Sequence, residues 1–586
     1  MNAPVQSPLP VFLPRFSDPR DVDEFVATLE RFERGEISPE DFRRYRLARG
    51  VYGQRQEGAQ MLRVKIPQGV LSAGQLRTLG EVADRWGHGH GHVTTRQNIQ
   101  YHFVPMPEVE AALRHLDTTG LTTREACGNT VRNVTADPLA GVVNHGTFDV
   151  TPYGEAISRF FLRLGWANSL PRKFKIALGY EPGDTALTSI HDVGLVARVH
   201  EGRRGFLVRV AGGLSTSPQN ALVFREFLPE SELLDVCAAV VRVFDRMGNR
   251  DNKHRARLKY VLRKLGPEKF RATLEEAFAA VQADGGHPLD LSVATEGPPP
   301  PPPSPAESAV PAGPLGRGYL RWRATNALGQ DQAGYHAVLV RLPLGRITTA
   351  QFEALARVTE AFGDGTLRLC VDQNVLLRFV PTDRLGALYT ALEAAGLGAP
   401  EARTVADVTT CPGAETCNLA VTSSRQVGAA ITARLESDPA LADAVALARD
   451  ATVKVSGCPN SCGQHHIATL GWHGAARRVG DRTAPVYQLH LGGGFDAQGA
   501  RFGRQVVKVA ARRVPEAMAR LLALYAAERG PDDTADRFFR DLPGPRVEAL
   551  LRDLVALDAE TPDEVFLDIG QDQGFQVAIG EGECAA

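Results

Sequence analysis

The sequence predicts a mixed α/β (α+β) fold that contains two copies of one β-α-β-α unit. Three observations support this prediction. The 45 residues from Met61 align without a gap to those from Ala337, at a constant offset of 276. Each copy passes from apolar residues at every second position to apolar residues at helical spacing. A proline-rich segment, 298–314, lies between the copies, and its six consecutive prolines favour an extended linker.

The first strand and first helix of each copy follow from local patterns. Apolar residues alternate over 62–66 and again over 338–342, which is typical of strands. A helix follows each strand, because both copies carry a capping box: Ser72 with Gln75 in the first copy, and Thr348 with Gln351 in the second.

The second strand and second helix complete each unit. The strand is predicted over 92–103 in the first copy and over 367–379 in the second. The helix then runs to Gly120 or to Gly396. Two such units can pack as a pseudo-twofold pair with a site between them.

Length and composition limit the class of protein. A chain of 586 residues is too long for one ordinary core and predicts two or more domains. With 43% hydrophobic and 23% charged residues it is globular, and its formal net charge of −2 excludes a global field for nucleic acid or anionic membranes. The first residues lack a secretory pattern, and no apolar run nears the roughly 18 residues of a membrane span. We expect a soluble cytoplasmic protein.

Two tight cysteine pairs point to a metal site. Cys411 and Cys417 have five residues between them, and Cys458 and Cys462 have three. Zinc prefers spacings of two to four residues, which only the second pair meets, whereas iron–sulfur clusters accept varied spacing. The spacing favours an iron–sulfur cluster but leaves zinc and buried structural cysteines open. The remaining cysteines are interpreted as core residues, except for one without an assigned role: Cys127, Cys237 and Cys370 in the core, and Cys584 in the polar tail.

The two copies differ at one charged position. Gln97 and Asn98 recur as Gln373 and Asn374, but aspartate replaces Arg96 in the second copy. This difference indicates that only the first copy presents an anion-binding residue. An arginine exposed beside a turn is the alternative.

Several longer motifs carry a family resemblance. TTRQNIQYHFVP, NTVRNVTADP, LPRKFKIAL, GNRDNKHRARLKY, the two cysteine pairs and YQLHLGGG occur in this order. In these motifs the chain resembles the siroheme and [4Fe–4S] nitrite/sulfite reductase family, in particular its sulfite reductase hemoproteins. The resemblance runs from about Val51 to about Leu542 and includes the repeat and the position of the linker.

The resemblance implies a pseudo-twofold pair of ferredoxin-like β-α-β-α half-domains plus two larger siroheme/iron–sulfur α/β domains. The expected divisions are an N-terminal helical arm (1–50), the first ferredoxin-like half-domain (51–125), the first siroheme/substrate domain (126–297), the proline-rich linker (298–314), the second half-domain (315–400), the [4Fe–4S]/siroheme domain (401–545) and a C-terminal tail (546–586).

The resemblance also implies the site residues. Cys462 would bridge the cluster and the siroheme iron, while Cys411, Cys417 and Cys458 would bind only the cluster. The anion pocket would comprise four cations: Arg96, Arg132, Lys173 and Lys175. The cofactor contacts would come from the basic run 249–259 and from the second copy: Arg257, Lys259, Gln373 and Asn374. Siroheme carries eight carboxylates, which need such partners when buried. Without the resemblance, these basic stretches would be interpreted as solvated surface.

The implied activity is an assimilatory sulfite reductase, which reduces sulfite to sulfide with six electrons. Nitrite reduction to ammonia is the alternative within the family. Plant-type nitrite reductases have asparagine at the position of Lys175, which favours sulfite, whereas Asn98 stands where sulfite enzymes often have threonine. A precorrin-3B synthase and a non-enzymatic zinc or iron–sulfur module are remote alternatives. No flavin or nicotinamide fingerprint occurs, so we expect an external electron donor, a ferredoxin or a flavoprotein subunit. A ferredoxin would need a basic patch, for which 501–513 is a candidate.

Overall fold

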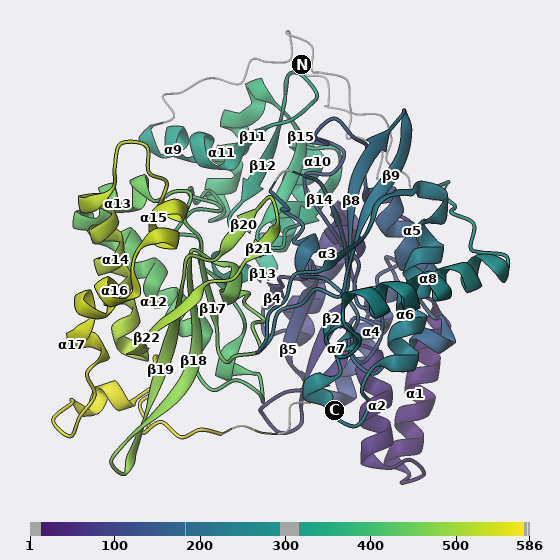
Figure 1. Ribbon diagram of the computed structural model, residues 1–586, viewed down its shortest axis with the longest axis horizontal. Helices are drawn as coiled ribbons and strands as arrows, with labels where there is room; N and C mark the ends of the chain where they lie inside the picture. The colour runs from purple at the N-terminus through teal and green to yellow at the C-terminus, as the bar shows by residue number, and fades with distance from the viewer. Residues whose placement is uncertain (1–12, 182, 293–315, 579, 581–582, 584–586) are drawn as a thin grey trace.

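The computed structural model describes residues 13–181, 183–292, 316–578, 580 and 583. The predicted linker at 298–314 and Cys584 lie outside the described residues. Helices and strands alternate along the chain and confirm the mixed α/β fold (Figure 1). Within the described residues, no helix is both long enough and apolar enough to cross a membrane.

The two repeated units form two interlocked five-stranded sheets. The first sheet has the order β1-β2-β5-β4-β13, with bounds Val51–Gly53, Ala59–Val64, Ile99–Pro105, His90–Val93 and Arg346–Thr348. The second has the order β11-β12-β15-β14-β3, with bounds Ala327–Gly329, Tyr335–Val340, Val375–Pro381, Thr366–Leu369 and Val70–Ser72. Each unit therefore gives one edge strand to the sheet of the other: β13 pairs with β4, and β3 pairs with β14.

The predicted second strand of each unit was wrong as a single strand. A tight turn divides it into the hairpins β4–β5 and β14–β15. Gln97 and Gln373 occupy these turns with φ angles of 53° and 72°, a left-handed conformation that ends a strand. The motif carrying Arg96 is consequently a hairpin loop.

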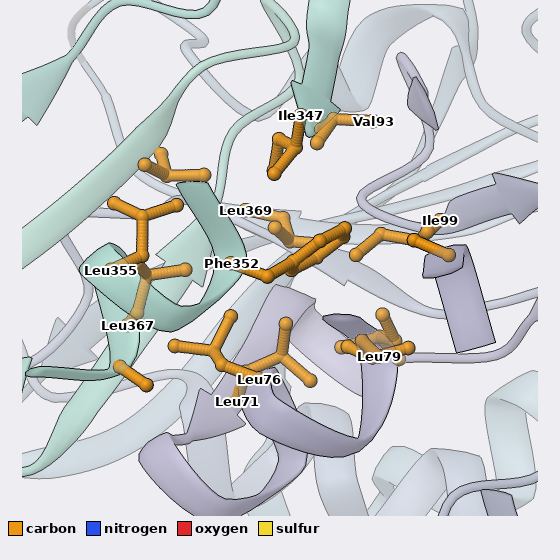
Figure 2. Close-up of a cluster of buried hydrophobic side chains, with 14 of the residues drawn as sticks. Leu71, Leu76, Leu79, Val93, Ile99, Ile347, Phe352, Leu355, Leu367 and Leu369 are labelled. Carbon is orange, nitrogen blue, oxygen red and sulfur yellow. The ribbon is translucent and has the colours of Figure 1, made fainter. Parts of the chain in front are cut away.

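The helices after the first strands bring the two units together. Both predicted capping boxes are present, at the starts of α3 (Ala73–Trp86) and α10 (Thr349–Phe362). Figure 2 shows Phe352 of α10 among apolar side chains of the first unit, including Leu76 and Leu79. A Cβ atom on Gly80 would lie 2.9 Å from the Cβ of Phe352, so this glycine permits the close approach of the two helices. The two units share one core.

Two larger sheets carry the rest of the chain and repeat a second topology. One has the order β10-β9-β8-β7-β6, with bounds Leu222–Pro229, Arg203–Val210, Val193–His200, Ile176–Gly179 and Thr135–Ala136. The other has the order β16-β17-β18-β19-β22, with bounds Thr409–Thr410, Val453–Ser456, Leu470–Val479, Arg482–Leu491 and Arg504–Ala510. In each sheet the first three strands in chain order are parallel, and the next two pair in antiparallel fashion. The repeat therefore extends beyond the aligned segments.

Helices cover these sheets and bury separate cores. The first larger sheet packs with α5 (Thr151–Phe161), α6 (Leu233–Met247), α7 (Leu258–Leu265) and α8 (Pro267–Ala283). The second packs with α12 (Ser424–Ser437), α13 (Ala442–Leu447), α14 (Val514–Glu528), α15 (Ala535–Asp541), α16 (Gly544–Leu550) and α17 (Arg552–Val555), which form the flank at the left of Figure 1. The remaining α-helices belong to the N-terminal arm and the half-domains: α1 (Pro19–Glu33), α2 (Pro39–Ala48), α4 (Val109–Asp117), α9 (Arg317–Asn326) and α11 (Leu385–Ala394).

Two described residues of the C-terminal tail, Gly580 and Glu583, contact distant parts of the chain. The Glu583 carboxylate accepts hydrogen bonds from the Arg46 guanidinium, at 2.8 Å, and from the Gly53 N–H, at 2.6 Å. The Gly580 N–H donates to the Asn418 carbonyl at 3.1 Å, one residue after Cys417. The tail thus passes beside the first cysteine pair.

Candidate functional site

The hairpin loop between β4 and β5 positions Arg96. The loop is closed by a hydrogen bond from the Thr94 N–H to the Asn98 carbonyl at 2.9 Å. The Arg96 guanidinium donates to the Thr135 hydroxyl at 3.1 Å and also contacts the Asn133 carbonyl and the His191 ring. Burial, and next the charge of Arg132, lower the pKa of Arg96 to about 9, so it stays protonated at neutral pH. The arginine is held as a fixed cation.

Lys173 and Lys175 lie immediately before β7. The intervening Phe174 is fully buried and forms a bridge with Val131, whereas both lysines are half-buried. The predicted alternation is therefore present: the phenylalanine enters the core and the lysines face the other side. Burial, followed by the charges of Arg96, Arg257 and Lys173, lowers the pKa of Lys175 well below its usual range. These cations lie close enough to affect one another.

Asp192 is the buried counter-charge of this group. Its carboxylate accepts hydrogen bonds from the Lys175 N–H at 2.9 Å and from the Arg257 guanidinium at 2.8 and 3.3 Å. Its side chain has no exposed surface. The Asp192 carboxylate thereby links the backbone of Lys175 to the side chain of Arg257.

Arg132 belongs to the same field of charge but is anchored differently. Its guanidinium donates to the carbonyls of Gly128, at 2.8 Å, and Ala126, at 3.3 Å. It nonetheless contributes to the lowered pKa of Arg96. The structure therefore brings Arg96, Arg132, Lys173 and Lys175 into one electrostatic neighbourhood.

The basic run 249–259 divides into an exposed part and a buried part. Arg250, Lys253 and Arg255 are exposed, whereas Arg257 and Lys259 are buried, with exposed fractions of 8% and 0%. The Lys259 ammonium donates to the carbonyls of Leu214 and Ser217 at 2.6 and 2.5 Å. Burial, with Arg257 and Arg263, lowers its pKa to about 7. The solvated-surface interpretation holds for the first three residues only.

The four cysteines gather where two parallel strands end. Cys411 follows β16, and Cys458 follows β17. Cys411 and Cys458 are buried, Cys417 is half-buried and Cys462 is exposed. Burial, and next the nearby Cys462 thiol, raise the pKa values of Cys411 and Cys458, so the thiols are close to one another.

Hydrogen bonds to sulfur already exist at this site. The Gly457 N–H donates to the Cys411 sulfur at 3.2 Å, and the Ser424 hydroxyl lies 3.2 Å from the same atom. Four thiols, one of which accepts a hydrogen bond from a backbone N–H, fit an iron–sulfur cube, whose potential such bonds tune. The donor set fits the cluster.

The cysteine site and the cation group meet at Cys462. The Thr95 hydroxyl, next to Arg96, donates to the Cys462 carbonyl at 3.1 Å. Cys462 also acts on the pKa of Lys175. An anion held by the cations would therefore lie near the cysteine predicted to join the two cofactors. Buried cations around this point also fit a polycarboxylate macrocycle.

Gln373 and Asn374 hold the two halves together. The Gln373 amide donates to the Val93 carbonyl of the first half at 3.0 Å, just as the Gln97 amide donates to the Leu369 carbonyl of the second half at 2.8 Å. The Asn374 amide donates to Asp407 at 2.6 Å. A direct cofactor contact by either residue stays a prediction.

Sequence reasoning missed His191 and Asp192. Both residues lie immediately before β8. His191 contacts Arg96, and Asp192 contacts Arg257. The signal was weak: a single polar pair between apolar residues in the segment SIHDVG. Such a pair is also common in ordinary turns.

The segment proposed as a basic patch has other contacts. Arg501 pairs with Asp536 at 2.7 Å, while Arg504, Arg512 and Arg513 donate to backbone carbonyls of the C-terminal segment. These arginines tie the last helices to the second larger sheet, while Arg504, Lys508 and Arg512 keep exposed side chains, so the docking role of 501–513 stays a prediction.

The fold and the site together place four thiols beside a group of buried and half-buried cations. Comparison with known families assigns the chain further. The nitrite and sulphite reductase 4Fe–4S domain matches residues 127–281 and 401–537, and the nitrite/sulfite reductase ferredoxin-like half domain matches 52–118 and 328–395. The chain belongs to the nitrite and sulfite reductase family and is an oxidoreductase.

Individual relatives carry both activities in their names. The chain is 29% identical to a ferredoxin–nitrite reductase of Synechococcus elongatus, over 79% of this chain and 86% of the relative. It is 30% identical to a sulfite reductase [ferredoxin] of Mycolicibacterium paratuberculosis, over 81% and 80% of the two chains. The solved structure of the Mycobacterium tuberculosis NirA protein is similar with a TM-score of 0.76 and 28% identity, covering 91% of this chain and 96% of that one.

Proposed function

We propose that the protein is an assimilatory sulfite reductase, which reduces sulfite to sulfide with six electrons at a siroheme coupled to a [4Fe–4S] cluster. The observation that carries the proposal is the meeting of the cation group with the cysteine site, through the bond from Thr95 to the Cys462 carbonyl. When bound, the coupled cofactors would pass electrons from the external donor to the anion. Cys411, Cys417, Cys458 and Cys462 would hold the cluster, with Cys462 as the bridge.

The protein's own cations would bind and orient the anion. Arg96, with its fixed fork of donors, and Arg132 would bind the anion oxygens. Lys173 and Lys175 would add charge and donate protons to oxygens as they leave as water. Arg257 and Lys259 would pair with cofactor carboxylates, with Gln373 and Asn374 supporting the cradle from the second half.

Two observations favour sulfite over nitrite. Lys175 places an amine beside the Arg96 guanidinium, and a bound dianion would favour its protonated, cationic form more strongly than a monoanion would. The Asn98 side chain, whose identity spoke against sulfite, accepts a hydrogen bond from the Ile66 N–H at 3.3 Å, just as its counterpart Asn374 accepts one from Leu342 at 2.9 Å. Asn98 is thus explained by the scaffold.

The electron donor is proposed to be an external ferredoxin, because several relatives are named as ferredoxin-dependent enzymes. The half-buried Cys417 would leave one side of the cluster near the surface that such a carrier must reach. None of the described cysteines forms a disulfide, which suits a reducing compartment, and we propose the cytoplasm.

Turnover of both anions tests the proposal. With reduced methyl viologen as the donor, we expect kcat/KM for sulfite, measured as sulfide, to exceed that for nitrite, measured as ammonium, by about 10-fold or more. Lys175→Asn should lower this ratio, while the exposed Lys253→Asn control should leave it unchanged. Ammonium formation that outpaces sulfide formation in the wild type would overturn the choice of sulfite. An absorption spectrum without a siroheme band would overturn the cofactor assignment and favour a precorrin-3B synthase-like enzyme.

A further inference from the structure

Four histidines gather immediately after the cysteine site. His465 and His466 lie in a short 3-10 turn (His465–Ile467), His473 on β18 and His490 on β19. The ring centroid of His465 lies 4.1, 4.8 and 4.7 Å from the ring centroids of His466, His473 and His490, respectively. All four residues are buried. No feature of the proposed sulfite chemistry uses them.

His465 lies at the centre of this group and has no partner. Its side chain has no exposed surface, and neither Nδ1 nor Nε2 has a hydrogen-bond partner. Leaving a buried polar atom unsatisfied costs about 1–3 kcal/mol. A ligand that accepts a nitrogen lone pair would remove this cost.

The neighbouring rings are oriented by bonds on their outer sides. The His466 Nε2–H donates to the Ser215 carbonyl at 2.9 Å, which leaves Nδ1 with a lone pair. His490 Nδ1 lies 3.4 Å from the Gly503 carbonyl, and its Nε2 lies 2.7 Å from His473 Nδ1. A ring nitrogen that donates to a carbonyl while the other faces inward is the usual arrangement of a metal-binding histidine.

We propose that His465, His466 and His490 bind a late transition-metal ion of the zinc class, with His473 as the fourth ligand. One nitrogen from each of the first three lies within 4.8 Å of the other two. A tetrahedral ion with metal–nitrogen bonds of about 2.0–2.1 Å would hold them about 3.4 Å apart, so small side-chain rotations complete the site. Imidazole nitrogen is a preferred ligand of zinc, copper and nickel.

The ion would connect the turn 465–467 to the adjacent strands β18 and β19 and, through His466, to the loop that contains Ser215. The turn 465–467 begins three residues after Cys462, His473 and His490 lie on adjacent strands, and His466 reaches the Ser215 carbonyl in the loop held by Lys259. A bound metal would therefore fix the segment after the proposed bridging cysteine. This role is independent of which anion is reduced.

Zinc stoichiometry and zinc absorption spectroscopy of the full-length holoprotein test the proposal. After equilibration with buffered Zn²⁺, we expect about one zinc per chain in the wild type and in the exposed control His200→Gln. His465→Gln and His490→Gln should each retain less than about a fifth of it, with unchanged iron content and circular dichroism. The zinc K-edge spectrum of the wild type should contain nitrogen neighbours at about 2.0 Å and no sulfur at about 2.3 Å.

The spectrum of the wild type decides the outcome even when a variant fails to fold. A wild type that binds no zinc under these conditions overturns the proposal. Zinc with sulfur neighbours also overturns it, because the metal would then occupy the cysteine site. Equal zinc content in the wild type and in a folded His465→Gln protein would also overturn the proposal.

Discussion

The two larger domains use the same strand order for opposite chemistry. In the first, the candidate cations Lys173 and Lys175 precede β7, at the amino end of a parallel strand. In the second, Cys411 and Cys458 follow β16 and β17, at the carboxyl ends of parallel strands. The corresponding parallel strand pairs are β6–β7, in which Thr135 lies opposite Ala177, and β16–β17, in which Thr409 lies opposite Lys454. One topology thus carries candidate cations at one end of its parallel strands and candidate metal ligands at the other, so a repeated scaffold constrains position more than chemistry.

Replacing Cys462, the proposed bridge between the cofactors, should have the largest effect on sulfite turnover. We expect Cys462→Ser to lower sulfite turnover by more than about 100-fold, since even outer partners of metal ligands contribute about 10- to 100-fold. Iron per chain and the paramagnetic resonance signal should fall with it. The core cysteine variant Cys237→Ala, in the first larger domain, should keep both. Normal sulfite turnover in Cys462→Ser would contradict the proposed role of Cys462 as the bridge between the cofactors.

A cation of the first half should affect the anion but not the metal. Arg96→Gln removes a charge-assisted hydrogen bond of about 1.5–3 kcal/mol, so we expect kcat/KM to fall about 10- to 100-fold with unchanged absorption by the cofactors. The counterpart in the second half, Asp372, pairs with Arg403, and Asp372→Asn should change kcat/KM less than about threefold. Equal losses in both variants would contradict the asymmetry.

The scaffold glutamines should behave symmetrically. Gln97 and Gln373 each donate to a carbonyl of the opposite half, so Gln97→Ala and Gln373→Ala should each lower the free energy of unfolding by about 1–3 kcal/mol. Chemical denaturation followed by tryptophan fluorescence measures both losses. A much larger loss of cofactor absorption in Gln373→Ala alone would instead favour its predicted role at the cofactor.

The last prediction concerns the pH dependence of the apoprotein, which leaves the chemistry of the holoprotein unchanged. Burial lowers the pKa of Lys259 to about 7 in the folded state, from an ordinary value of 10.5. Between these values the unfolded chain binds more protons, so the free energy of unfolding should rise with pH by up to about 1.4 kcal/mol per unit from about pH 7 to 10. Urea unfolding of apoprotein from a siroheme-deficient host should show this slope, and Lys259→Met should flatten it. Pairing with a cofactor carboxylate should abolish it in the holoprotein.

Local signals predicted the helices better than the sheets. The capping boxes at Ser72 and Thr348 are present because their hydrogen bonds depend on residues three positions apart. The turns at Gln97 and Gln373 were missed because neither contains the glycine or proline that usually marks one. The exchange of β3 and β13 was missed as well, since three-residue strands carry almost no pattern of their own.

The cation group was predictable only through motifs. Spacing alone gives Lys173 and Lys175 a common face, and the buried Phe174 between them confirms it. Spacing does not reveal that Asp192 joins Lys175 to Arg257, because that contact depends on how β7 and β8 pair. The two cysteine pairs were found directly, since both members of each pair lie within one loop region.

The exchanged edge strands also affect how the protein folds during its synthesis. β5 ends at Pro105, yet the edge strand β13 that completes its sheet begins at Arg346. At about 5–20 residues per second, a ribosome needs on the order of tens of seconds to make the intervening chain. Throughout this interval the nascent first half-domain has an open sheet edge at β4 and an apolar surface that Phe352 will later cover. Emerging polypeptide of this kind is a natural client for chaperones, and expression at lower temperature should raise its soluble yield.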